Sequence, residues 1–336
     1  MKKFFNISVF SFLASCIFLV LISFCFLYLC SVPTKENRTS FIIKSGLSAT
    51  EIGNLLESDG IIRDRHLFNI SYLVMNRLLG KVIMAGEYSF YAGENIFDIL
   101  RKLFEGKTIS HKILIPEGII STQVVCMVNS GYGILNEEKE YEFKNGELMP
   151  DTYVYKYGNS SYDIISRMKN SMTKFLDEEW NNIDESILDV IKNKQDVVTL
   201  ASILEKESRV DAEKPMIASV YINRLRKGMK LDADPSVIFA INSGNNFGIR
   251  LFYKDLRIQS PYNTYINKGL PPGPICNPGR ASISAVLRPS KSNYLYFVSD
   301  NSGTHRFAKN FSEHIANVKL YKEARQLVGV NQPNKQ

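Results

Sequence analysis

Two glutamates near the end of one predicted helix have the residue type and spacing for acid–base chemistry. Residues 196–208 carry apolar side chains on one broad face, which predicts a helix with Asp196 as its N-cap. At about 100° per residue, Glu205 and Glu207 fall on opposite flanks of that face, with Glu207 nearer its centre. A carboxyl group at the edge of an apolar face beside a cleft can have its pKa raised by desolvation and serve as a general acid. From spacing alone, two solvated glutamates near a helix end are the favoured interpretation.

Further polar residues downstream could form the walls of a site. Asn223 lies in a predicted helix over residues 218–225, and Asp234 followed by Pro235 predicts the N-cap and first turn of another helix. Residues 259–280 are rich in Pro and Gly, which predicts an extended loop with tight turns. Such a loop is typical of a cleft wall for sugars, and equally of a structural connection. The candidate residues of this stretch are Tyr262, Asn263, Thr264 and Arg280.

A predicted hairpin over residues 294–307 carries two more candidates, His305 and Lys309. Both could line a site, although a lone histidine in such a place is more often a surface residue. The four histidines and five cysteines show no Cys-x-x-Cys and no metal-ligand spacing apart from one isolated histidine pair at the C-terminal end. We therefore expect no metal, no cofactor and no disulfide framework.

Two smaller predicted parts of the chain precede the elements that position these residues. Residues 41–130 read as two passes of strand, helix and helix, a small α+β module of a kind that usually binds and does not catalyse. Its predicted elements are a strand from Phe41, a helix from Ser48 with a capping box to Glu51, a helix over 65–79, a strand over 86–90, a helix over 94–104 closed by Gly106, a strand over 109–115 and a helix from Ser121. Residues 163–177 have helical periodicity.

The chain begins with a long apolar run. Residues 4–32 contain no charged side chain and are long enough to cross a hydrocarbon core of about 30 Å as a helix. A secretory signal is the rival interpretation, but its apolar core is shorter and ends in a small-x-small cleavage site that is missing here. The run is therefore predicted to be an uncleaved anchor, with Lys2 and Lys3 in the cytoplasm and the rest of the chain outside.

The overall charge adds little to these assignments. The net charge of +7 is modest for 336 residues and scattered along the chain. It fits an anionic neighbour, such as lipid headgroups or wall polymers, and equally a basic solvated surface. No run of Arg and Lys with interleaved aromatic residues is present, so nucleic acid is not an expected partner.

Together, these motifs resemble the YceG-like endolytic murein transglycosylases over essentially everything after the anchor. The matching segments are LASILEKES at 200–208, ASVYINRL at 218–225, Asp234-Pro235, PYNTY at 261–265, GLPPGPI at 269–275, NPGR at 277–280, PDTY at 150–153, and the hairpin from YLYFV at 294–298 through Glu313-His314. Residues 146–149 depart from the aromatic-rich version of the family. So many motifs in one order make the resemblance specific.

The resemblance implies an α+β protein with a transmembrane helix, a small LysM-like α+β module and a mixed α/β catalytic domain. The corresponding divisions are a cytoplasmic N-terminus at 1–3, the anchor at 4–32, a linker at 33–40, the LysM-like module at 41–130, a connector and helical subdomain at 131–194, and the catalytic domain at 195–330. It also implies a single-pass protein of the cell inner membrane, with its catalytic domain on the periplasmic or outer face. The implied partners are peptidoglycan glycan strands, the membrane and peptidoglycan synthases.

The implied reaction is that of a lyase. It cleaves the β-1,4 bond between N-acetylmuramic acid and N-acetylglucosamine and leaves a 1,6-anhydro end. The family's functional glutamate falls on the Glu-x-Glu-Ser element, which we assign to Glu207 with Glu205 as the fallback. One carboxyl group suffices, because the sugar's own 6-hydroxyl replaces water and no second carboxylate is needed. The supporting residues implied for substrate are Glu205, Asn223, Asp234, Tyr262, Asn263, Thr264 and Arg280.

Two other functions stay open at this point. A non-catalytic, membrane-anchored glycan-binding scaffold of the wall-synthesis machinery would also use an anchor and a LysM-like module. A hydrolase with the same specificity is nearer to the lyase, and its product differs by one water.

Overall fold

The computed structural model describes residues 2–31, 37–137, 142–300 and 303–330. Its chain divides into two compact units. Unit 1 comprises Met1–His111 and Val154–Gly158, and unit 2 comprises Lys112–Tyr153 and Asn159–Gln336. The finer domain divisions expected from the sequence, and the LysM-like character of residues 41–130, stay predictions.

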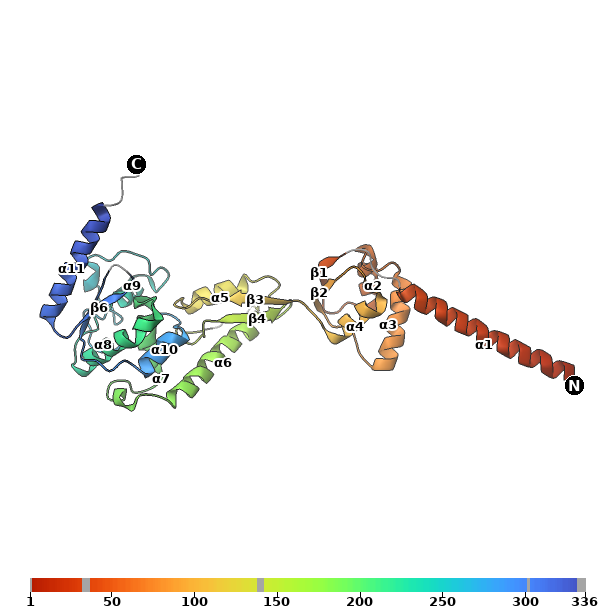
Figure 1. Cartoon of the computed structure of the whole chain (residues 1–336), viewed down its shortest axis with the longest axis horizontal. Coiled ribbons are helices and arrows are strands. Elements are labelled where there is room, and N and C mark those ends of the chain that lie inside the picture. Colours follow the sequence, from red (N-terminus) through yellow and green to blue (C-terminus); the bar gives the residue numbers. More distant parts are fainter. Residues whose placement is uncertain (1, 32–36, 138–141, 301–302, 331–336) are drawn as a thin grey trace. The chain divides into compact units, whose positions relative to one another are not determined.

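Unit 1 is built around one antiparallel ribbon. Its elements are α1 (Lys2–Ser31), β1 (Arg38–Ile43), α2 (Ala49–Ser58), α3 (Arg65–Leu79), β2 (Gly86–Phe90) and α4 (Ile96–Glu105). Strand β1 pairs with β2, with Phe41 opposite Tyr88, and helices α2, α3 and α4 gather around the pair (Figure 1). Tyr88, Phe90 and Leu100 are fully buried in the resulting core. Burial of such side chains from both strands and helices holds this small unit together.

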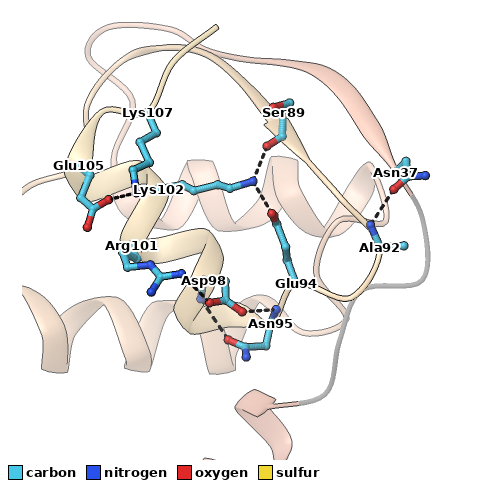
Figure 2. Close-up of polar contacts among 10 residues, drawn as sticks. All are labelled: Asn37, Ser89, Ala92, Glu94, Asn95, Asp98, Arg101, Lys102, Glu105 and Lys107. Atoms are coloured by element: carbon cyan, nitrogen blue, oxygen red, sulfur yellow. Dashed lines mark hydrogen bonds and ion pairs between the residues drawn. The ribbon is translucent and has the colours of Figure 1, made fainter.

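Local capping decides where the helices of unit 1 begin and end. The predicted capping box at the start of α2 is present: Ser48 accepts from the amide of Glu51, and the Glu51 side chain accepts in return. Asn95 and Asp98 form a second box at the start of α4, and Gly106 ends that helix in the left-handed region at φ 61°. Figure 2 shows the second box, and beside it the Lys102 ammonium donating to the carbonyl of Ser89 at 2.9 Å.

The predicted anchor covers residues 4–32, most of which lie in α1. Among the residues that the structure describes, no helix is both long enough and apolar enough to span a membrane.

Unit 2 is mostly helical. Its helices are α5 (Ser121–Asn129), α6 (Ser161–Trp180), α7 (Lys194–Glu207), α8 (Lys214–Arg226), α9 (Asp234–Asn242), α10 (Arg280–Leu287) and α11 (Phe311–Val330), with short 3-10 turns at Glu185–Ile187, Asp211–Glu213 and Asp255–Arg257. Helix α10 packs against both α7 and α8, and the three bury Leu200, Tyr221 and Ile283 in the core of this unit. The core therefore fixes α7, and with it the helix end that carries the two glutamates.

Two short sheets complete the fold. Strands β5 (Tyr296–Ser299) and β6 (His305–Ala308) form the predicted hairpin, which packs against α11. Strands β3 (Ser110–Leu114) and β4 (Thr152–Lys156) pair with each other. The boundary between the two units falls inside each of these strands. The mixed helix and strand character expected from the sequence is confirmed.

The predicted N-cap of α7 is wrong. The helix begins at Lys194, and the side chain that accepts at its start is that of Asn193, which receives the amide of Asp196 at 2.9 Å. The carboxylate of Asp196 accepts instead from the amide of Lys192 at 2.7 Å. Asn and Asp are equally good caps, so composition alone does not identify which of two neighbours takes the role.

Candidate active site

Glu205 and Glu207 lie in the last turn of α7 and have different surroundings. The helix buries every residue from Val197 to Leu204. The two glutamates follow directly, two positions apart, so their side chains leave the helix about 200° apart. One therefore turns toward α10 and the other toward a pocket beside α8 and α9.

Glu205 is committed to protein partners. One carboxylate oxygen accepts from the amide of Gly279 at 2.8 Å and from the hydroxyl of Ser282 at 2.7 Å, and the other accepts from the ammonium of Lys214 at 3.2 Å. The Glu205 side chain is only 8% exposed and that of Lys214 2% exposed. With three donors around it, this carboxylate ties α7 to α8 and to the start of α10.

Glu207 lines a pocket of about 450 Å³ on the other side of the helix. Burial, followed by the negative charge of Asp234, raises the pKa of Glu207 to about 7, and the nearby hydroxyl of Tyr221 opposes this shift. Glu207 keeps part of its surface exposed although protein atoms crowd its carboxyl group. Within the described residues the Tyr221 hydroxyl has no hydrogen-bond partner, and its effect on the pKa of Glu207 is the weakest of the three. At neutral pH a substantial fraction of Glu207 is thus protonated.

Acidic, basic and aromatic side chains line this pocket together with Glu207. They come from the end of α7, from α8, from the segment leading into α9, from the loop after α9, and from the hairpin with α11. The principal members are Arg224, Asp232, Asp234, Tyr265, Tyr296, Phe297, His305, Phe311 and His314. Aromatic faces with polar groups between them suit a sugar ring, which presents both apolar C–H faces and hydroxyl groups.

Asp234 is the substrate candidate that the structure brings to Glu207, but its predicted N-cap role is wrong. Ala233 occupies the N-cap position, and Asp234 is the first residue of α9. Its carboxylate accepts from the hydroxyl of Tyr265 at 2.6 Å. Burial, followed by this hydrogen bond to Asp234, raises the pKa of Tyr265, so the phenol keeps its proton and remains a donor. The Asp234 charge is thereby held in place beside Glu207.

Arg224 organises the wall of the pocket opposite α9. Its guanidinium donates to the carbonyls of Leu295 at 2.6 Å and Leu231 at 2.9 Å, and to the carboxylate of Asp232 at 3.0 Å. Asp232 has φ 48°, a left-handed conformation that is uncommon for a residue other than Gly. Strained residues of this kind gather at functional sites. From the sequence, Arg224 was named only as part of the motif at 218–225 and was given no role. The available signal was the residue type, because the planar guanidinium of arginine donates several hydrogen bonds in fixed directions.

Other predicted substrate residues hold the fold around the site. Asn223, next to Arg224, donates to the carbonyls of Ser292 and Tyr294 at 2.9 and 3.0 Å. Asn263 is fully buried and donates to the carbonyls of Leu256 and Ile258 at 3.0 and 2.9 Å. Thr264 accepts from the amide of Ala233 at 3.0 Å, directly before α9. These contacts position α8, the loop and α9, and the substrate-binding roles expected for the three residues stay predictions.

Tyr262 and Arg280 lie outside the Glu207 pocket. Tyr262 lines a separate pocket of about 850 Å³, together with Pro272 and Pro274 of the proline-rich loop. The Arg280 guanidinium lies 3.5 Å from Asp151 and 4.8 Å from the centre of the Phe175 ring. The proline-rich loop that was predicted to form a cleft wall therefore lines a different pocket from the one that contains Glu207.

Residues of the hairpin and α11 contribute to the site in unequal ways. His305 is in the Glu207 pocket, as its predicted place in the hairpin allowed, but Glu213 engages both its amide and its ring nitrogen at 2.9 Å. His314 and Tyr265 were not singled out from the sequence. No group of three or more His, Cys, Asp and Glu side chains among the described residues could hold a metal ion.

Comparisons with known proteins show the same family over most of the chain. A sequence model of the YceG-like family matches residues 41–320. A Bacillus subtilis (strain 168) protein named endolytic murein transglycosylase is 32% identical in an alignment 314 positions long, which covers 83% of this chain and 84% of that protein. A protein of the same name from Streptococcus pneumoniae serotype 2 is 27% identical over 85% of this chain, which spans 59% of that relative.

A solved structure shows the same fold. The 2.6 Å crystal structure of a YceG-like protein from Listeria monocytogenes matches with a TM-score of 0.52 at 31% sequence identity. The match covers 84% of this chain and 98% of that one.

Proposed function

This chain belongs to the YceG-like family, and from that membership we propose that it is an endolytic murein transglycosylase in which Glu207 performs the proton transfers. The Bacillus and pneumococcal relatives carry the name of that activity. The general function is therefore that of a lytic transglycosylase, a lyase that acts on peptidoglycan. The raised pKa of Glu207 and the lining of its pocket support this pocket as the site of the reaction.

The observation that carries the site assignment is a carboxyl group with a pKa of about 7 in an aromatic-lined pocket. In its protonated form, Glu207 donates a proton to the oxygen that links N-acetylmuramic acid to N-acetylglucosamine, and that bond breaks. The resulting carboxylate then removes the proton from the 6-hydroxyl of the muramic acid. The 6-oxygen bonds to the anomeric carbon, which closes the 1,6-anhydro ring and returns the proton to Glu207.

The surroundings of the two glutamates support Glu207 over Glu205. A general acid must hold a proton at working pH and must reach the substrate. Glu205 accepts from three protein donors and is nearly buried, so its carboxylate oxygens are occupied within the protein. Glu207 has an open pocket in front of it and a negative neighbour that favours its protonated form.

Product mass spectrometry tests the assignment. The full chain is incubated with uncross-linked peptidoglycan strands, alongside Glu207→Gln and Glu205→Gln variants. We expect 1,6-anhydro ends from the wild type, none from Glu207→Gln, and anhydro ends from the folded fraction of Glu205→Gln. Products heavier by one water would identify a hydrolase, and no cleavage by any form would favour a glycan-binding scaffold. Full activity in Glu207→Gln would refute the site.

We further propose that residues 4–32 anchor the enzyme in the cell inner membrane, with the catalytic part on the periplasmic or outer face. The support is the uncharged apolar run that follows Lys2 and Lys3. Such a location would place the site beside newly made glycan strands and the synthases that make them. Protease added outside intact spheroplasts should digest the part that carries Glu207, and protection of that part would contradict the orientation.

A further inference from the structure

One imidazole in the Glu207 pocket has an unsatisfied nitrogen. His314 lies on α11 and lines the pocket together with Glu207. Its Nδ1 is buried and has no hydrogen-bond partner among the residues that the structure describes. A buried polar atom without a partner costs about 1–3 kcal/mol. An unsatisfied group of this kind in a native structure calls for an explanation, and a partner supplied from the pocket is one.

The neighbours of His314 fix its ring and leave it able to accept a hydrogen bond. The imidazole stacks on Tyr296 with ring centres 5.1 Å apart at 23°, and Phe311 lies 6.3 Å away on the same helix. Burial, followed by the positive charge of Arg224, lowers the pKa of His314. The ring is therefore neutral at physiological pH, and in the tautomer with its proton on Nε2 it presents Nδ1 as an acceptor.

The other histidine of the pocket provides a contrast. His305 has its ring nitrogen Nδ1 against the carboxylate of Glu213 at 2.9 Å, and its amide donates to the same carboxylate. Its hydrogen-bonding capacity serves to hold β6 to the start of α8. His314 has no comparable protein contact at Nδ1 in the described part of the chain, and its side chain is only partly buried. Of the two pocket histidines, His314 is therefore the one whose Nδ1 is not used by the described protein.

We propose that His314 is a substrate-binding residue of the Glu207 pocket, which accepts a hydrogen bond at Nδ1 from a hydroxyl or acetamido N–H of the glycan. The inference rests on the proposed function, because it takes a glycan strand to be the occupant of the pocket. It assigns His314 to binding and leaves the proton transfers to Glu207.

The test separates binding from turnover. Affinity for uncross-linked peptidoglycan strands is measured on the full chain carrying Glu207→Gln, so that no substrate is consumed. Adding His314→Phe keeps a flat ring against Tyr296 but removes the acceptor, and adding His314→Gln keeps an acceptor. We expect the Phe variant to bind about tenfold more weakly, as the loss of one net hydrogen bond predicts, and the Gln variant to retain most of the affinity.

Two further measurements exclude a merely structural role. In the background with Glu207 intact, His314→Phe should raise KM about tenfold and change kcat little, since one binding contact is lost from ground state and transition state alike. Its melting temperature should not fall, because the substitution removes an unsatisfied buried polar atom. Lys319→Ala is the matched control: this residue of the same helix is 79% exposed and should change none of these values.

The binding role of His314 and the proposed function can fail independently of each other. Unchanged affinity in His314→Phe, or an equal loss in His314→Gln, would overturn the inference even if the wild type cleaves glycan strands. Absence of cleavage by the wild type would overturn the proposed function, and the affinity measurements on the Glu207→Gln background would still decide whether His314 binds glycan.

Discussion

Glu205 and Glu207 show how strongly position controls the chemistry of one residue type. They share a helix turn and are separated by one lysine. One carboxylate is surrounded by an amide, a hydroxyl and an ammonium, and the other by a pocket and the negative charge of Asp234. The first arrangement occupies the carboxylate oxygens with protein donors, and the second raises the pKa of Glu207.

Glu205→Gln is expected to act on stability. The substitution leaves the buried ammonium of Lys214 without one of its two carboxylate partners, which should lower the free energy of unfolding by about 2–4 kcal/mol. Denaturant unfolding measures the loss. The matched control is Asp211→Asn, which removes the other partner of Lys214, but one that is 70% exposed. The control should cost about 1 kcal/mol or less, and equal losses would contradict the structural role of Glu205.

Asp234→Asn is expected to move the pH dependence of cleavage. The charge of Asp234 raises the pKa of Glu207, so its removal lowers that pKa. Glu207 then loses its proton at lower pH, and the alkaline limb of the kcat/KM profile shifts toward lower pH. Asparagine still offers Tyr265 an oxygen acceptor, so the loop stays in place.

The control for this change is Asp232→Asn. Asp232 lines the same pocket but pairs with Arg224, so its removal should shift the alkaline limb less. A profile whose alkaline limb is unmoved in Asp234→Asn, or moved upward, would show that Asp234 does not set the protonation of Glu207.

At the scale of elements, the Arg224 side chain connects α8 to the start of the hairpin and to the segment before α9. The Arg224 guanidinium donates to the Leu295 carbonyl beside β5, to the segment before α9, and to Asp232. An arginine can donate to three acceptors at once because its planar guanidinium carries donors that point in different directions. A lysine cannot replace it in this role, since its ammonium is a compact point charge. The pocket wall formed by β5 is thus attached to the helix that also packs against α10.

Arg224→Lys should therefore lower both stability and activity. We expect a loss of about 2–3 kcal/mol in the free energy of unfolding, because buried carbonyls lose their donor. Activity should fall as well, since Tyr296 and Asp232 would move relative to Glu207. Arg226→Lys on the same helix is the control. Its guanidinium pairs with the half-exposed Asp189, and it should cost less than about 1 kcal/mol. Similar effects in the two variants would contradict the tethering role.

The sequence predicted several helix ends that depend on local capping, although it assigned the cap of α7 to Asp196 where Asn193 holds it. The helix over 65–79, the box at Ser48 and the stop at Gly106 rest on contacts within a few residues, which spacing reveals. Asp234 was misassigned as a cap because its partner, Tyr265, lies 31 residues away. His314 was missed for the same reason. His314 lines a pocket that is formed by segments far apart in the chain, and no local sequence pattern indicates such a pocket.

At the scale of the whole molecule, each unit has a hydrophobic core of its own. The core of unit 1 includes Leu56, Tyr88 and Leu100, and that of unit 2 includes Leu200 and Ile283. Every residue that lines the Glu207 pocket belongs to unit 2. Activity should therefore depend on the folding of unit 2, whatever the stability of unit 1.

Calorimetry of two core variants tests this division. Leu100→Ala and Leu200→Ala each remove a fully buried side chain and should cost about 2–5 kcal/mol in the unit concerned. We expect two unfolding transitions, with each variant lowering a different one, because cores that share no side chains unfold as separate cooperative units. Loss of glycan cleavage on heating should follow the transition that Leu200→Ala lowers and should be unaffected by Leu100→Ala. A single transition lowered by both variants would show that the two cores fold as one.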